Sequence, residues 1–136
     1  DVRRIILGLS DGGAHVDALC DAGYCTYLLG HWVREKEVMT LERAIQRITT
    51  EPANLFGITQ RGRIAEGLAA DFAIFDLTTV GSDKTGEMRY DLPGGGRRLV
   101  VPSRGIEYTV VNGDILYAHG KDSGARTGTV LRSGEA

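Results

Sequence analysis

The chain has 136 residues, of which 42% are hydrophobic and 25% are charged, the composition of a globular chain of about one domain's length. Its 16 basic and 18 acidic residues leave a formal net charge of −2, which gives no support to a nucleic-acid or anionic-membrane partner. No window approaches the roughly 18 consecutive apolar residues that a membrane span needs.

The start of the chain and its cysteines bear on its origin. Asp1 is not an initiator Met, and no long apolar segment of a signal peptide follows it; this favours a piece of a longer protein. Cys20 and Cys25 lie in a chain without secretory features, so we expect free thiols in a reducing cytoplasm.

The first residues predict a strand with a polar end. We expect a buried, parallel-type strand over 3–9, because its apolar run at 5–9 shows no alternation. Ser10, Asp11, Gly12 and Gly13 follow. Asp and Gly are ordinary turn residues, and the residues alone favour a polar turn. If the strand belongs to a barrel, however, Asp11 stands at the catalytic end.

Three helices are predicted next. Apolar residues recur at helical spacing from Tyr27 to Val33 and give way to a polar end. Thr40 is placed as the N-cap of a second helix, whose apolar positions are 41, 44, 45 and 48. Pro52 opens a third, short helix that ends at Gly57.

The second half reads as antiparallel β-structure. We expect short strands at 63–65 and 71–76, and then a long Gly- and Pro-rich excursion over 78–105 with little regular structure. Residues 107–111 and 115–118 flank Asn112-Gly113, a pair suited to a type I′ hairpin turn. The tail from Gly120 is expected to be extended.

A single parallel-type strand needs neighbours on both sides, and the predicted helices cannot cover both of its faces. The chain is therefore predicted to be part of something larger or to pair with another chain.

The motifs together resemble the C-terminal part of metal-dependent amidohydrolases, and within them the N-acyl-D-amino-acid deacylases, or D-aminoacylases. The resemblance covers essentially the whole chain. It is carried by Ser10-Asp11 after an apolar strand, Leu29-Gly30-His31-Trp32-Val33-Arg34-Glu35, Thr50-Glu51-Pro52-Ala53, Arg61-Gly62-Arg63-Ile64 with Gly67 and Ala70-Asp71, Val111-Asn112-Gly113, and Thr127-Gly128 in the tail.

This resemblance implies an α+β fragment of a zinc-bearing enzyme. Residues 1–60 would be the C-terminal end of a TIM (β/α)8 barrel, with 3–11 as its last strand. Residues 61–136 would be the C-terminal half of a small β-sandwich, with the long excursion and the extended tail. The resemblance implies two partners, the remainder of the same amidohydrolase chain and a small-molecule substrate. The exposed β-edge adds a third candidate, a further copy in a homo-oligomer.

The same resemblance assigns the site. Asp11 would carry a proton from the attacking water to the departing amine and is also a candidate ligand of the zinc, whose other ligands would lie upstream of Asp1. Gly12 and Gly13 would let the backbone pass close to the substrate. His15 is a candidate substrate-side group, with an ordinary loop histidine as the equally weighted alternative.

Other polar residues are given structural roles. His31 fits an amphipathic helix better than a metal site, His119 is expected at the surface, and Asp71 and Asp76 are expected to be turn and edge acceptors. Tyr108 and Tyr117 are predicted to pack across the hairpin.

Two other functions remain open. One is a cyclic amidase of the dihydroorotase or hydantoinase type, which would share the aspartate. The other is a non-catalytic module that associates with a second copy through its exposed β-edge.

Overall fold

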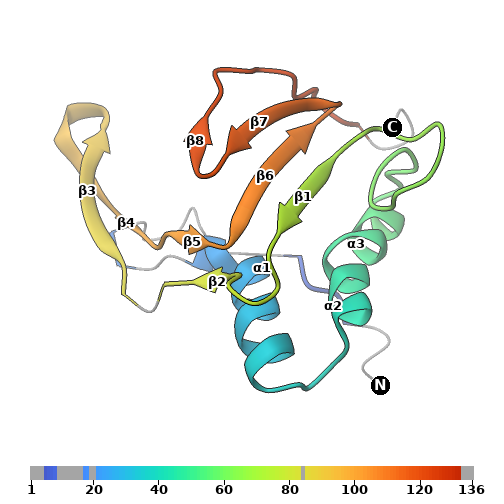
Figure 1. The fold of residues 1–136 in the computed structure, drawn as a ribbon. Helices are drawn as coiled ribbons and strands as arrows, with labels where there is room; N and C mark the ends of the chain where they lie inside the picture. The colour runs from blue at the N-terminus through green and yellow to red at the C-terminus, as the bar shows by residue number, and fades with distance from the viewer. Residues whose placement is uncertain (1–4, 9–16, 19–20, 84, 133–136) are drawn as a thin grey trace. The chain divides into compact units, whose positions relative to one another are not determined.

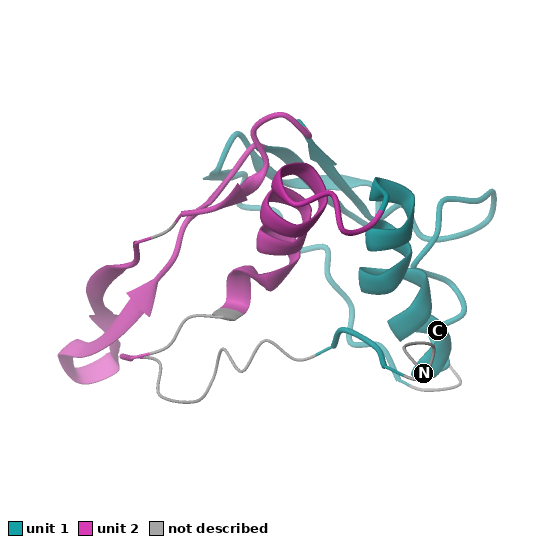
Figure 2. Cartoon of the chain, turned by 90° about the horizontal axis from the view of Figure 1, so that it is seen from below, with its two compact units in different colours: residues 1–8, 40–76, 106–136 teal, residues 9–39, 77–105 magenta. Residues whose placement is uncertain are grey.

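A computed structural model describes residues 5–8, 17–18, 21–83 and 85–132. The chain divides into two compact units, each built from separate segments (Figure 2). Unit 1 comprises Asp1–Gly8, Thr40–Asp76 and Ile106–Ala136, and unit 2 comprises Leu9–Met39 and Leu77–Gly105. Within the described part of the chain, no helix has the length and apolar character needed to cross a membrane.

Unit 2 contains three consecutive helical segments (Figure 1). They are the 3-10 helix η2 (Asp21–Gly23), the α-helix α1 (Tyr24–Tyr27) and the π-helix η3 (Leu28–Glu35). The predicted helix is therefore confirmed, but most of it has the wider π-type hydrogen bonding, which apolar periodicity does not distinguish from an α-helix.

A close approach fixes the π-helix against the chain that precedes β2. An added Cβ on Gly30 would lie 2.6 Å from the Val80 carbonyl oxygen, so only glycine fits there. The Arg34 guanidinium donates hydrogen bonds to the Leu77 and Val80 carbonyl oxygens, at 3.1 and 2.5 Å. The core of this unit consists of buried aliphatic side chains: Leu28, Leu29, Val33 and Val80.

The rest of unit 2 contains two small antiparallel sheets. β2 (Gly81–Ser82) pairs with β5 (Ser103–Arg104), and β3 (Glu87–Leu92) pairs with β4 (Gly96–Val100) across the 3-10 turn η4 (Pro93–Gly95). The expectation of little regular structure over 78–105 is wrong. Gly94 and Gly95, with φ of 71° and 73°, do not break up the segment but form the tight turn that joins two strands.

Unit 1 contains the two remaining helices. α2 (Leu41–Ile48) begins where predicted, and the Thr40 hydroxyl accepts a hydrogen bond from the Arg43 backbone N–H at 3.3 Å. α3 (Thr50–Leu55) carries Pro52 in its first turn and is followed by Gly57 at φ 68°, in agreement with the pattern of Pro near the start and Gly beyond the end.

A four-stranded antiparallel sheet forms the other part of unit 1. Its strand order is β1-β6-β7-β8, with β1 at Phe72–Phe75, β6 at Ile106–Val111, β7 at Asp114–Ala118 and β8 at Lys121–Asp122. Asn112 and Gly113 have φ of 51° and 89°, the positive values that a type I′ turn requires. The predicted strand at 71–76 and the predicted hairpin are confirmed.

Three local expectations are not met. Tyr117 lies opposite Thr109 while Tyr108 lies opposite Ala118, so alternation places the two tyrosines on opposite faces of the sheet. Residues 5–8 are not in a strand, and Ile5 is 60% exposed, because no described strand pairs with them.

The short strand predicted at 63–65 is also wrong, and Ile64 is 84% exposed. The preceding residue Gly62 is instead held against helix α3. The Thr50 hydroxyl donates to the Gly62 carbonyl oxygen at 2.6 Å, and an added Cβ on Gly62 would lie 2.6 Å from the Ala53 Cβ.

Candidate functional site

The four residues predicted for the catalytic and substrate site lie outside the described residues. These are Asp11, Gly12, Gly13 and His15. Their roles therefore stay predictions, and the geometry below concerns the other motif residues.

Four motif residues of unit 1 meet at the tip of the β6–β7 hairpin. We call Arg61, Asp71, Asn112 and Thr127 the tip cluster. The Arg61 guanidinium forms an ion pair with Asp71 and donates to Asn112 Oδ1 at 2.6 Å. The Asn112 side-chain amide donates to the Thr127 carbonyl oxygen at 2.6 Å. Residues that are far apart in the sequence thus hold one turn in place.

The tip cluster also fixes the ionisation state of its carboxylate. Partial burial by itself raises the pKa of Asp71, but the Asn112 backbone N–H, which donates to Asp71 Oδ1 at 2.8 Å, and the Arg61 guanidinium outweigh it and hold that pKa below its usual value. Asp71 is a charged acceptor with its lone pairs engaged, which confirms its predicted structural role and makes it unsuited to proton transfer near neutral pH.

The described residues do not form a metal site. They contain no group of three His, Cys, Asp or Glu side chains arranged to hold a metal ion. His31 lies on the π-helix, where its Nδ1 is 2.9 Å from Glu35 Oε2 and its ring stacks on Tyr27 with centroids 4.9 Å apart. The structural role predicted for His31 is therefore confirmed.

A second polar group lies where the β7 strand ends. His119 Nδ1 is 2.7 Å from Glu107 Oε2, and His119 Nε2 is 3.1 Å from the Tyr108 hydroxyl. His119 is largely exposed, as predicted. The two partners of His119 were not predicted from the sequence, because the register shifts by one residue between Thr109 and Val110 and thereby brings residue 119 beside Glu107.

A small pocket in unit 2 contains Cys25. Its volume is about 230 Å³, and it is lined by Ala22, Gly23, Cys25, Thr26, Val101 and Ser103. Cys25 is a free thiol, and burial raises its pKa. The other cysteine predicted to be a free thiol, Cys20, lies outside the described residues. Because the thiolate is the reactive form, this pocket does not present an activated nucleophile.

Comparison with known proteins identifies the family. The sequence profile of the amidohydrolase family matches residues 4–117. The chain belongs to the amidohydrolase family.

Within this family the chain is D-aminoacylase-like. It is 39% identical over 110 residues to an N-acyl-D-glutamate deacylase of Alcaligenes xylosoxydans xylosoxydans, a match that covers 81% of this chain and 20% of that protein. It therefore spans about a fifth of the length of this relative.

Solved structures agree with this placement. A crystal structure of N-acyl-D-glutamate deacylase from Bordetella bronchiseptica, complexed with zinc and a phosphonate inhibitor, matches with a TM-score of 0.63 and 38% identity. A crystal structure of D-aminoacylase matches with a TM-score of 0.65 and 30% identity. Each match covers 81% of this chain and 21% of the solved chain. The described fold is thus similar to part of these solved chains.

Similarity to cyclic amidases is shorter. A dihydroorotase of Lactobacillus johnsonii is 44% identical over 50 residues, which is 37% of this chain and 12% of that protein. The greater coverage by the deacylases favours the deacylase branch over the cyclic amidases.

Proposed function

We propose that this chain is the C-terminal segment of a metal-dependent amidohydrolase that hydrolyses the amide bond of N-acyl-D-amino acids. The observation that carries the proposal is the match to an N-acyl-D-glutamate deacylase over 81% of the chain. A tip cluster composed of the residues that carry the family resemblance supports it.

The metal would be held mainly by residues outside this chain, as the resemblance to metal-dependent amidohydrolases implies. The described residues hold no cluster of three metal-ligating side chains. Zinc is the metal present in the solved N-acyl-D-glutamate deacylase. When bound, zinc lowers the pKa of a coordinated water to about 7 and polarises a carbonyl group.

Asp11 is the proton carrier in this proposal. As the water oxygen bonds to the amide carbon, the Asp11 carboxylate accepts the proton that the water loses. It then donates that proton to the amide nitrogen as the carbon–nitrogen bond breaks, because an amide anion is a very poor leaving group. The products are the free carboxylic acid and the amino acid.

The neighbours of Asp11 would shape the substrate side of the site. Gly12 and Gly13 have no side chains to block an approach of the backbone to the substrate. His15 is proposed to lie beside the substrate. We expect the enzyme to be cytoplasmic, as its cysteines suggest.

The unit 1 sheet supports the proposed composite sandwich of 61–136. Ile74 lies opposite Tyr108, and Val110 lies opposite Ile115, so these four residues share one face. Ile74 and Ile115 remain 48% and 47% exposed. An apolar sheet face of this kind is normally covered by a second layer, which the rest of the polypeptide would provide. Residues 1–60 would complete the barrel of the same enzyme.

The test is hydrolysis by the full-length protein of a panel of N-acetyl-D-amino acids, with the L-isomers as controls. We expect Asp11→Asn to lower kcat at least about 100-fold, the usual contribution of a positioned acid–base group, with metal content unchanged. Asp91→Asn is the matched control, because Asp91 lies exposed on the β3–β4 hairpin; its kcat should equal that of the parent protein.

Two results would overturn the assignment. Full turnover by Asp11→Asn would remove Asp11 from the reaction. Loss of bound metal from that variant, measured by elemental analysis, would make Asp11 a metal ligand in place of a proton carrier.

A cyclic amidase is the second candidate, favoured by the dihydroorotase similarity. It predicts ring opening of dihydroorotate or a hydantoin by the same preparation, with no release of acetate from the N-acetyl panel. The third alternative, a self-associating module without catalysis, predicts a concentration-dependent dimer in light scattering and no turnover of either substrate class.

A further inference from the structure

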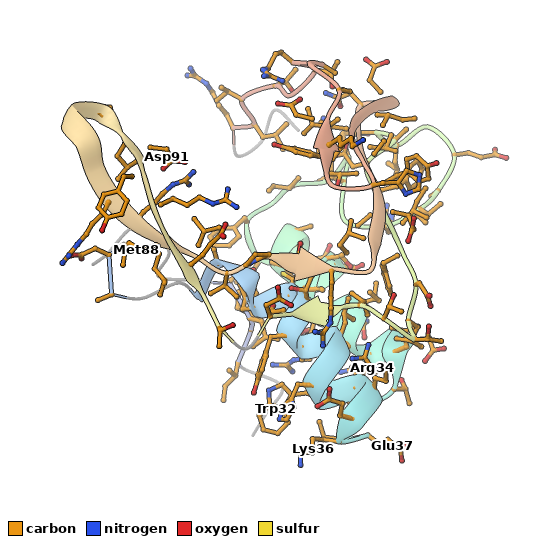
Figure 3. All side chains as sticks on the ribbon, turned by 60° about the vertical axis from the view of Figure 1, so that its left-hand side comes forward. Trp32, Arg34, Lys36, Glu37, Met88 and Asp91 are labelled. Atoms are coloured by element: carbon orange, nitrogen blue, oxygen red, sulfur yellow. The ribbon has the colours of Figure 1, made fainter. Side chains whose placement is uncertain are left out.

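The β3–β4 hairpin has two chemically different faces. Met88 lies opposite Leu99, and Arg89 lies opposite Arg98. The register shifts between Arg89 and Leu92, but Asp91 pairs with Arg98, on the face opposite to that of Met88 and Leu99. Because neighbouring residues of a strand point to opposite faces, Tyr90 lies with Met88 and Leu99 on one face, which we call the apolar hairpin face. Figure 3 labels Met88 and Asp91, which leave the hairpin on different sides.

The charges of the other face are paired within the hairpin. The Arg98 guanidinium donates to both carboxylate oxygens of Asp91 at 2.7 Å, and Arg89 pairs with Glu87. A partner of this hairpin therefore gains little from adding charge, and the energetic gain lies in covering the apolar hairpin face.

That face is exposed in this chain. Tyr90 is 68% exposed and Met88 is 39% exposed. Buried aromatic side chains contribute heavily to packing and interface energies, and a two-stranded hairpin is marginally stable in water by itself. Exposed apolar surface with a polar rim usually marks an interaction site.

Contacts with neighbouring residues fix the β3–β4 hairpin near both ends of β4. An added Cβ on Gly86 would lie 2.6 Å from Leu99 Cδ1, so the Leu99 side chain packs against the backbone just before β3. At the other end of β4, the Arg97 guanidinium donates to Asp17 Oδ2 at 3.0 Å. Arg97 is the one charged residue of β4 that shares the apolar hairpin face by alternation, and its ion pair reduces the charge that this face offers.

We infer that the apolar hairpin face packs against the part of the same polypeptide that lies outside these 136 residues. The inference rests on the proposed function, in which this chain is a segment of a longer enzyme. The lengths support this occupant, because about four fifths of the deacylase relative lies outside its match to this chain. The occupant is expected to be apolar and uncharged where it meets Tyr90.

The test is hydrogen exchange on the protein produced from the complete gene. We expect the β3 amides to be protected at every protein concentration in a preparation that is monomeric by light scattering. Tyr90→Ser should raise their exchange rates about tenfold or more, since burial of an aromatic side chain is worth more than a factor of ten. Arg89→Ser, on the opposite face of the same strand, should change them far less.

Three outcomes contradict the inference. Unprotected β3 amides show that nothing covers the face. Protection that rises with concentration, together with a dimer mass, shows that a second copy covers it. Equal effects of the two substitutions show that the protection does not come from the apolar hairpin face.

Hydrolysis measured on the same preparation separates this inference from the proposed function. If the β3 amides are protected but N-acetyl-D-amino acids are not hydrolysed, the inferred packing of the apolar hairpin face is kept and the proposed activity is rejected. Turnover with unprotected β3 amides rejects only the packing.

Discussion

Two antiparallel hairpins in this molecule are held in different ways. The β6–β7 hairpin is fixed at its turn by the tip cluster, whose members come from four separate segments. The β3–β4 hairpin has ion pairs mainly within its own strands, and all six residues of β3 are exposed. The first is integrated into its unit by long-range contacts, whereas the second depends on whatever covers its apolar face.

The pair of aspartates Asp71 and Asp91 makes this comparison measurable. Each carboxylate accepts hydrogen bonds from an arginine, and each has a lowered pKa. For Asp71, partial burial raises the pKa, but Asn112 and Arg61 together outweigh it. For Asp91, the hydrogen bond from Arg98 is the main cause of the lowered pKa. The surroundings of the two differ, since Arg61 is mostly buried and its Nε has no hydrogen-bond partner, while Arg98 is exposed.

The largest effect is expected for Asp71→Asn. It leaves the buried Arg61 charge without a counter-ion, and the loss of a hydrogen-bonded partner of a buried charged group costs about 2 kcal/mol. We expect this decrease in the free energy of unfolding of unit 1, measured by urea denaturation and by exchange of the β6 and β7 amides. An unchanged exchange rate would show that the turn is stable without the tip cluster.

An intermediate effect is expected on acidification. Because the folded-state pKa of Asp71 is depressed, its stabilising contribution is complete above the unfolded-state pKa of about 3.9 and is lost as the pH falls through the lower, folded-state value. As the pH falls from about 5 to about 2, the free energy of unfolding should therefore decrease more for the parent protein than for Asp71→Asn. Parallel pH curves for the two proteins would contradict the linkage.

The smallest effect is expected for Asp91→Asn. Surface ion pairs contribute little, because water and salt screen them. Thermal unfolding and exchange of the β3 amides should stay the same within the error of measurement. A destabilisation equal to that of Asp71→Asn would remove the distinction between the two hairpins.

The elements that local signals specify were predicted from the sequence. The type I′ turn follows from Asn112-Gly113, and α2 follows from its Thr40 cap and apolar spacing. Both depend on residues a few positions apart, where turn geometry and capping act.

The elements that depend on distant partners were not predicted. The β3–β4 hairpin was missed because its glycine run also suits an irregular loop, and the π-helix because its register depends on packing beyond apolar spacing. Of the candidate site, Asp71 was given its role correctly, but its partners Arg61 and Asn112 lie ten and 41 residues away. No local pattern reveals such pairs.

The tip cluster has a consequence for how the protein is made. Arg61 leaves the ribosome well before Thr127, by about 3 to about 13 s at synthesis rates of about 5–20 residues per second. During that interval the guanidinium can meet Asp71 and then Asn112, but the Asn112 side-chain amide does not yet have the Thr127 carbonyl oxygen to which it donates. The final closure of unit 1 must therefore wait for the tail, and nascent chains stopped before Thr127 should be more susceptible to proteases than those that extend past it.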